Sequence, residues 1–182
     1  MKRASVVIQC ALLFLTLLAG PALFAQRPVS PRGQERLIRE VRHELVMLPF
    51  YNVFDNLEYR VDGDVVTLQG QVTRPSLKSD AEAAVKRIEG VTNVVNQIEV
   101  LPPSSTDDQI RQAVYRALFS VDSSLFRYRM GVVPPIHIIV KNGRVTLMGV
   151  VDNEADKNTA GLRAQRVPGT FSVTNNLTVS KK

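Results

Sequence analysis

The sequence predicts an α+β protein made of two tandem αββαβ units, each a small three-stranded mixed sheet covered by two helices. The first observation behind this prediction is an internal repeat. A shift of 79 residues lays VDGDVVTLQGQV (61–72) on VKNGRVTLMGVV (140–151). The second is the order of hydrophobic periods in each copy: helix, two strands, helix, strand. The third is the strand–helix–strand crossover, which is right-handed and therefore places the last strand parallel to the one before it.

The composition is that of a globular protein. The chain has 182 residues, of which 45% are hydrophobic and 22% charged, and this balance excludes wholesale disorder. The length leaves room for one ordinary domain or two small ones. Because each unit is small and has one sheet face covered by helices, the two units are expected to pack together or against a partner.

The first 25 residues have the layout of a secretory signal peptide. Lys2 and Arg3 precede an apolar run over 6–18, and small residues lead to a cleavage site expected after Ala25. A retained membrane anchor is the alternative, although the run is short for a spanning helix. Residues 26–34 are polar and are expected to form a flexible tether. Export predicts a periplasmic location, with peripheral association with a membrane as an option.

The first unit is expected at residues 35–102. Its opening helix is marked by an apolar stripe at helical spacing, formed by Leu37, Ile38, Val41, Leu45 and Leu48. The later elements are, in order, a strand at 57–61, a hairpin turn at Asp62-Gly63, a strand at 65–72, a helix after Pro75 with Ala81, Val85 and Ile88 inward, and a strand at 92–101. Residues 103–106 are the expected linker.

The second unit is expected at residues 107–180 and runs the same way. Its opening stripe consists of Ile110, Val114, Ala117, Leu118 and Val121. The later elements are strands at 136–140 and 145–151 that turn at Asn142-Gly143, a helix at 153–167 and a strand at 171–179. The connection after its first helix is longer than in the first unit. Long loops that carry aromatic and basic residues are frequent sites of function.

The repeated motif resembles the BON domain. The residues that carry the resemblance in the first unit are Val66, Leu68, Gly70, Val72, Gly90, Val91, Val94, Asn96, Ile98 and Val100. Their counterparts are Val145, Leu147, Gly149, Val151, Gly169, Val173, Asn175, Leu177 and Val179, whereas Thr170 departs from the usual valine. A signal peptide followed by two such units is similar to tandem-BON periplasmic proteins induced by osmotic stress. The resemblance implies an αββαβ fold, an envelope location and phospholipid binding, with no catalytic activity.

The marked glycines and asparagines have a structural interpretation. Gly70 and Gly149 lie within strands, where glycine marks a bulge or the close approach of another backbone. Gly90 and Gly169 follow helices, where glycine accepts a positive φ. Each of Asn96 and Asn175 is expected to bond the backbone at a strand irregularity. We list these six as structural motif residues: Gly70, Gly90, Asn96, Gly149, Gly169 and Asn175.

No catalytic set, metal site or cofactor motif is recognisable. His43 and His137 are isolated, and no His or Cys cluster has the spacing of a zinc site. No serine lies in a nucleophile-elbow context, and no glycine-rich phosphate loop is present. We therefore expect no enzyme, no metal and no cofactor. Nucleic acid is not expected as a partner, because the exported chain has only a modest basic excess, which suits an anionic membrane surface better.

One group of residues predicts a binding surface. On the helix expected at 107–120, Arg111, Tyr115 and Phe119 form a ridge that is expected to point away from the core. The longer connection that follows alternates aromatic and basic residues: Phe126, Arg127, Tyr128 and Arg129. Exposed rings flanked by arginines suit a lipid interface. The alternative is that this surface packs against the first unit or covers the sheet.

The sequence thus predicts a non-enzymatic envelope protein that binds anionic phospholipid surfaces through its second unit, with a role in envelope integrity or osmotic stress. The alternative is a protein-interaction or chaperone-like module for other envelope proteins. Lipid binding is expected to need anionic lipid and to weaken with salt, whereas protein interaction need not. The oligomeric state does not follow from the sequence.

Overall fold

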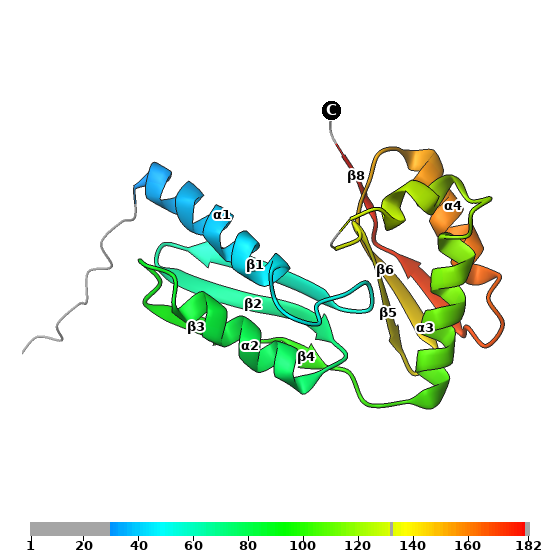
Figure 1. The fold of residues 1–182 in the computed structure, drawn as a ribbon, viewed down its shortest axis with the longest axis horizontal. Coiled ribbons are helices and arrows are strands. Elements are labelled where there is room, and N and C mark those ends of the chain that lie inside the picture. The colour runs from blue at the N-terminus through cyan, green and yellow to red at the C-terminus, as the bar shows by residue number, and fades with distance from the viewer. Residues whose placement is uncertain (1–29, 132, 181–182) are drawn as a thin grey trace, which may run out of the picture.

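The computed structural model describes residues 30–131 and 133–180 of the chain. The predicted signal segment 1–25 and the first residues of the predicted tether lie outside this part. Figure 1 shows two modules of similar construction, the first running from α1 to β4 and the second from α3 to β8. Both modules are αββαβ units with helices over one face of a mixed sheet, and the predicted fold class is confirmed.

Each module has one sheet in which a central strand separates an antiparallel neighbour from parallel ones. In the first, β2 pairs antiparallel with β1 and parallel with β3 and β4. In the second, β6 pairs in the same way with β5, β7 and β8. The elements of the first module are α1 (Pro31–Val46), β1 (Asn56–Asp62), β2 (Val65–Val72), α2 (Pro75–Lys86), β3 (Asn93–Asn96) and β4 (Glu99–Val100). Those of the second are α3 (Ser105–Leu118), the 3-10 helix η1 (Ser124–Arg129), β5 (Ile136–Lys141), β6 (Arg144–Val151), α4 (Glu154–Gln165), β7 (Ser172–Asn175) and β8 (Thr178–Val179).

The last strand of each module is broken in two by an asparagine side chain. Asn96 Oδ1 accepts a hydrogen bond from the Ile98 N–H at 3.2 Å, and its amide donates to the Lys78 carbonyl on α2 at 2.9 Å. Asn175 repeats the arrangement with Leu177 and with Lys157 on α4. Each asparagine therefore ties the break in the strand to the second helix of its module.

Two glycines allow the hairpin strands to approach closely. Gly70 and Gly149 have φ of +112° and +114°. A Cβ at Gly149 would lie 2.0 Å from the Pro135 carbonyl oxygen, and one at Gly70 would lie 2.1 Å from that of Asn56. No side chain fits at either position, because the neighbouring backbone already occupies the space. Gly90 and Gly169 have positive φ after the second helix of each module.

Several predicted boundaries are wrong by a few residues. Helix α1 begins at Pro31, within the predicted tether, because the Ser30 side chain caps it by accepting from the Gly33 N–H at 3.2 Å. Helix α3 begins at Ser105, inside the predicted linker 103–106, with Ser104 as its cap. The first hairpin turns at 63–64 rather than at Asp62-Gly63. Caps and turns depend on local geometry, which the hydrophobic period does not report.

The core contains most of the predicted stripes, with two exceptions. Ile38 is exposed, whereas Leu37, Val41 and Leu45 are buried beside it. Val121 is 84% exposed, because α3 ends at Leu118 and the helical period no longer applies beyond it.

Candidate functional site

The two modules pack together through the docking segment, residues 47–55. This segment connects α1 to β1 within the first module. Val53 of this segment is 7% exposed and belongs to the hydrophobic core of the second module. Its carbonyl accepts a hydrogen bond of 2.8 Å from the Ile138 N–H, on the outer edge of β5. The first module therefore supplies a core residue to the second and covers part of an otherwise open sheet edge.

Aromatic contacts lie on both sides of Val53. The Tyr51 ring stacks on His137 with centroids 5.7 Å apart, and Phe54 meets Tyr115 edge to face at 6.1 Å. Burial raises the pKa of Tyr51 to about 12 and lowers the pKa of His137. The His137 Nδ1 is buried with no hydrogen-bond partner among the described residues. The contact between the modules thus favours neutral side chains.

A buried carboxylate holds the docking segment in shape. Asp55 is fully buried and accepts hydrogen bonds from the Thr73 N–H at 2.7 Å, the Thr73 hydroxyl at 2.8 Å and the Asn52 N–H at 3.2 Å. These bonds tie the docking segment to Thr73, next to the end of β2, before the segment reaches the second module.

A separate contact between the modules is an ion pair between Lys141 on β5 and Glu99 on β4.

The predicted ridge does not point into solvent, so that expectation is wrong. Arg111 is 4% exposed: one Nη donates to the Val140 carbonyl at 2.6 Å and the other pairs with Asp108. Phe119 is 3% exposed and lies in the core of the second module. Tyr115 is half-buried against Phe54 of the first module, which is the packing that the sequence left open as the alternative.

The aromatic and basic run after α3 is also largely engaged. Tyr128 is buried, donating from its hydroxyl to Asp156 at 2.7 Å and accepting from the Asp152 N–H at 2.8 Å. Arg127 is half-exposed and pairs with both of these acids. Phe126 is half-buried beneath Arg129, whose guanidinium lies 5.3 Å from the ring centroid. Phe126 and Arg129 alone in this run keep an exposed face without a carboxylate partner in the described part of the chain.

The sequence interpretation missed an exposed surface at the C-terminal end of α1. We use the name tip for Met47 and Phe50, which follow α1, together with Arg39, Arg42 and Val46 of the helix itself. Met47 and Phe50 are strongly exposed, Phe50 at 65%. Arg39 and Arg42 are exposed and have no carboxylate within 4.0 Å among the described residues. The apolar run VMLPF at the end of the helical stripe was the available signal.

The backbone of Phe50 is strained. Its φ is +68°, a left-handed conformation that bulky residues rarely adopt and that costs on the order of 1 kcal/mol or more. The Arg74 guanidinium lies 4.9 Å from its ring centroid. Such outliers gather at functional sites, because a surrounding structure must hold them in place. The docking segment provides this restraint by anchoring Val53 three residues later.

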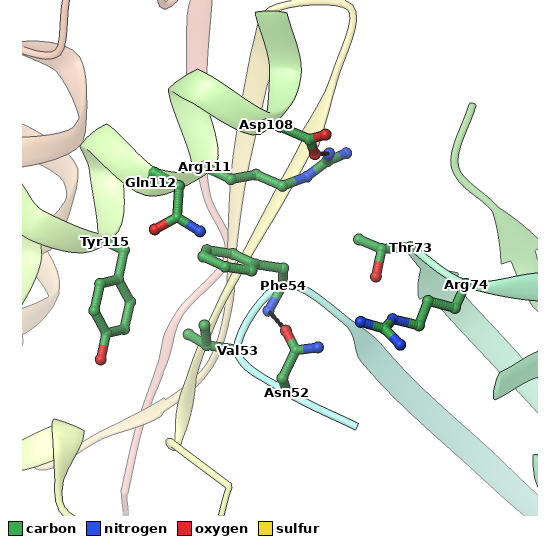
Figure 2. A pocket seen from close by; sticks show the side chains of 9 residues that line it. All are labelled: Asn52, Val53, Phe54, Thr73, Arg74, Asp108, Arg111, Gln112 and Tyr115. Atoms are coloured by element: carbon green, nitrogen blue, oxygen red, sulfur yellow. Dashed lines mark hydrogen bonds and ion pairs between the residues drawn. The ribbon is translucent and has the colours of Figure 1, made fainter. Parts of the chain in front are cut away.

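A cleft of about 640 Å³ lies where the two modules meet. Figure 2 shows that its walls come from the docking segment, the end of β2 and helix α3. The residues that line it are Asn52, Val53, Phe54, Thr73, Arg74, Asp108, Arg111, Gln112 and Tyr115. Neither module forms this cleft alone.

The family of the chain follows from the repeated architecture. The BON domain model matches residues 36–102 and again 106–181, which together span most of the sequence. The chain belongs to the BON domain family. BON domains are non-catalytic binding domains of envelope proteins, so family membership indicates a binding role. Within residues 30–131 and 133–180, no cluster of acidic, His or Cys side chains is arranged to hold a metal, and none of the helices combines the length and hydropathy needed to cross a bilayer.

Two solved structures are similar to the chain at low sequence identity. No curated protein matches the chain. Among solved structures, the C-terminal domain of CdsD, a structural protein of the type III secretion system of Chlamydia trachomatis, is similar at 14% identity, covering 80% of this chain and 98% of that one with a TM-score of 0.31. A second structure of CdsD has 16% identity, 80% and 94% coverage, and a TM-score of 0.30.

Proposed function

We propose that this BON protein is a non-enzymatic, exported envelope protein that binds anionic phospholipid surfaces through the tip of its first module. The observation that carries the proposal is the exposed, strained Phe50, whose ring lies 4.9 Å from the Arg74 guanidinium, with Met47 exposed three residues earlier and Arg39 and Arg42 on the preceding helix. Rings and thioethers enter the headgroup layer, while guanidinium groups meet lipid phosphates. The export step rests on the signal-like residues 1–25 of the sequence.

The tip has the charge and shape that such contact requires. Arg39, Arg42 and Val46 line one shallow hollow on the outer face of α1. Arg36 pairs with Glu40 and Glu89, so its charge is compensated within the fold. An arginine near an anionic surface contributes about 1 kcal/mol of attraction, which salt screens. Phe126 and Arg129 of the second module offer a smaller secondary contact.

Vesicle flotation of residues 26–182 tests the proposal. We expect flotation with phosphatidylglycerol vesicles at low salt, and none with phosphatidylcholine or at high salt. The variant Met47→Ser/Phe50→Asn is expected to lower vesicle affinity at least tenfold, because inserting each side chain is worth about 1 kcal/mol or more. Asparagine at position 50 tolerates the left-handed backbone, so the fold is retained.

A matched control separates the tip from exposed apolar residues in general. Val121→Ser/Met130→Ser removes two exposed apolar side chains from the second module and is expected to leave flotation unchanged. Equal flotation of the tip variant and the unmodified chain would refute the tip as the contact. Loss in the control variant alone would transfer the contact to the second module. Absence of flotation with every lipid would favour a protein partner instead.

A further inference from the structure

The cleft between the modules brings together two arginines that are far apart in the sequence. Arg74 lies between β2 and α2 in the first module, as the N-cap residue of α2, and Arg111 lies on α3 in the second. Both residues line the cleft; Figure 2 shows Arg74 directed into it from the side of Thr73 and the Arg111 guanidinium beside Asp108. Because each module supplies one of them, the pair exists only when the modules are docked.

Arg111 is held rigidly and is not fully satisfied by the fold. Its guanidinium is fixed by the Val140 carbonyl on one side and Asp108 on the other. Its Nε is buried and has no partner in the described residues. Each Nη has two N–H donors and uses one in these contacts, so the second N–H of each Nη is the donor left for a carboxylate or phosphate. An immobilised guanidinium therefore loses little side-chain entropy when it binds such a group.

Arg74 supplies a second, more accessible cation. No carboxylate lies within 4.0 Å of it in the part of the chain described, and its guanidinium rests on the Phe50 ring. The Gln112 side chain at the same cleft makes no hydrogen bond to any described residue. Both groups are donors with capacity left for a ligand.

Asp108 compensates one of the two charges that line the cleft, that of Arg111, and Arg74 is left without a carboxylate partner among the described residues. Asp108 is the only carboxylate among the lining residues that the structure describes, and its side chain is largely exposed beside Arg111. Asp55 lies behind Thr73, where its oxygens accept three hydrogen bonds from protein donors. The lining therefore keeps one guanidinium in excess of its carboxylate, which favours an anionic ligand.

The rest of the cleft is apolar. Val53, Phe54 and Tyr115 form this part, with the two rings edge to face. A volume of about 640 Å³ lies within the range of roughly 300–1,000 Å³ typical of small-molecule sites. A charged end beside an aromatic surface fits a ligand that has both an oxyanion and a hydrocarbon part.

We infer that the cleft between the modules binds a single anionic amphiphile, with Arg74 and Arg111 holding its oxyanion and Phe54 and Tyr115 contacting its hydrocarbon chain. The oxyanion is a phosphate if the ligand is a phospholipid and a carboxylate if it is a fatty acid. This inference goes beyond the proposed binding of a membrane surface, since it concerns one molecule held in the cleft between two modules.

The test is a titration of residues 26–182, followed by backbone amide NMR shifts, with short-chain amphiphiles kept below their micelle concentration. The probes are dihexanoyl phosphatidylglycerol, octanoate, dihexanoyl phosphatidylcholine and inorganic phosphate. We expect saturable shifts at Thr73 and Gln112 with at least one of the first two probes, and at least tenfold weaker binding of the last two. The stronger of the two anionic amphiphiles identifies the source of the oxyanion.

Two variants make the result decisive. Arg74→Gln changes an exposed side chain and is expected to weaken binding about tenfold or more, the loss of one charge-assisted contact. Arg166→Gln removes an exposed arginine that does not line the cleft and is expected to bind as the unmodified chain does. Absence of saturable shifts with both anionic amphiphiles, or unchanged affinity in Arg74→Gln, would overturn the inference.

The titration contains no vesicles, so its outcome is independent of the proposed function. Saturable binding in the cleft without flotation would refute only the tip as a membrane contact. Flotation without binding in the cleft would refute only the amphiphile site.

Discussion

The packing of Val53 predicts that one substitution in the first module destabilises the second. Val53→Ala removes two carbon groups from a side chain that is 7% exposed in the core of the neighbouring module. At about 0.8 kcal/mol for each buried group, the transfer term is about 1.6 kcal/mol. The cavity that remains raises the cost of the substitution to about 2–3 kcal/mol.

Amide hydrogen exchange measures this effect at the contact itself. The Ile138 N–H donates to the Val53 carbonyl, so its exchange reports separation of the docking segment from β5. A loss of about 2 kcal/mol corresponds to roughly thirtyfold faster exchange, because 1.4 kcal/mol is a factor of ten. The matched control is Val121→Ala, which shortens a valine that is 84% exposed in the same module.

Equal exchange rates of the Ile138 N–H in Val53→Ala and in the unmodified chain would contradict this prediction. It also fails if Val121→Ala accelerates exchange equally, since the effect would then not depend on burial. Either result would mean that Val53 contributes no net packing energy to the second module.

Two further predictions concern His137 and the hairpin glycines. Burial lowers the pKa of His137 below its ordinary value of 6.5, so the unfolded chain binds the proton more readily than the folded chain. The free energy of unfolding is therefore highest above about pH 7. It declines as the pH falls through 6.5, by at most about 1.4 kcal/mol per pH unit. His137→Phe keeps a ring against Tyr51 and should reduce the dependence of the unfolding free energy on pH, measured by urea unfolding between pH 5 and 8. An unchanged pH dependence in this variant would exclude His137 as its source. Gly149→Ala is expected to lower the free energy of unfolding in urea by more than about 3 kcal/mol, because its Cβ would clash with the Pro135 carbonyl. The control Gly63→Ala, at a position with open space and φ of +64°, should lower it by about 1 kcal/mol. Similar losses at both positions would contradict the clash.

The repeat made most of the fold predictable. The paired segments 61–72 and 140–151 became the central strands β2 and β6, and the crossover rule placed β3 and β7 parallel to them. Stripe residues such as Val41 and Val114 are buried, because a helix with one apolar face has few other ways to remove that face from water. These features depend on local periodicity and short-range connection rules.

The binding surface was less predictable. Helical spacing placed Tyr115 and Phe119 away from the main stripe, but Phe119 lies just beyond the helix and joins the same core, and spacing does not say what covers a second face. Phe119 is covered within its own module and Tyr115 by Phe54 of the other. The tip was overlooked because VMLPF resembles a continuation of the core stripe. Only the end of α1 and the left-handed turn at Phe50 bring these side chains outward.

The sequence by itself determined the two αββαβ modules, their order and their hydrophobic cores, since periodicity and turn residues act over a few positions along the chain. Only the tertiary structure decided how the modules meet. Val53 enters the second core, Tyr51 covers His137, and Arg74 faces the same cleft as Arg111. Such contacts join residues tens of positions apart, and their energies depend on burial and shape that no local pattern of residues encodes.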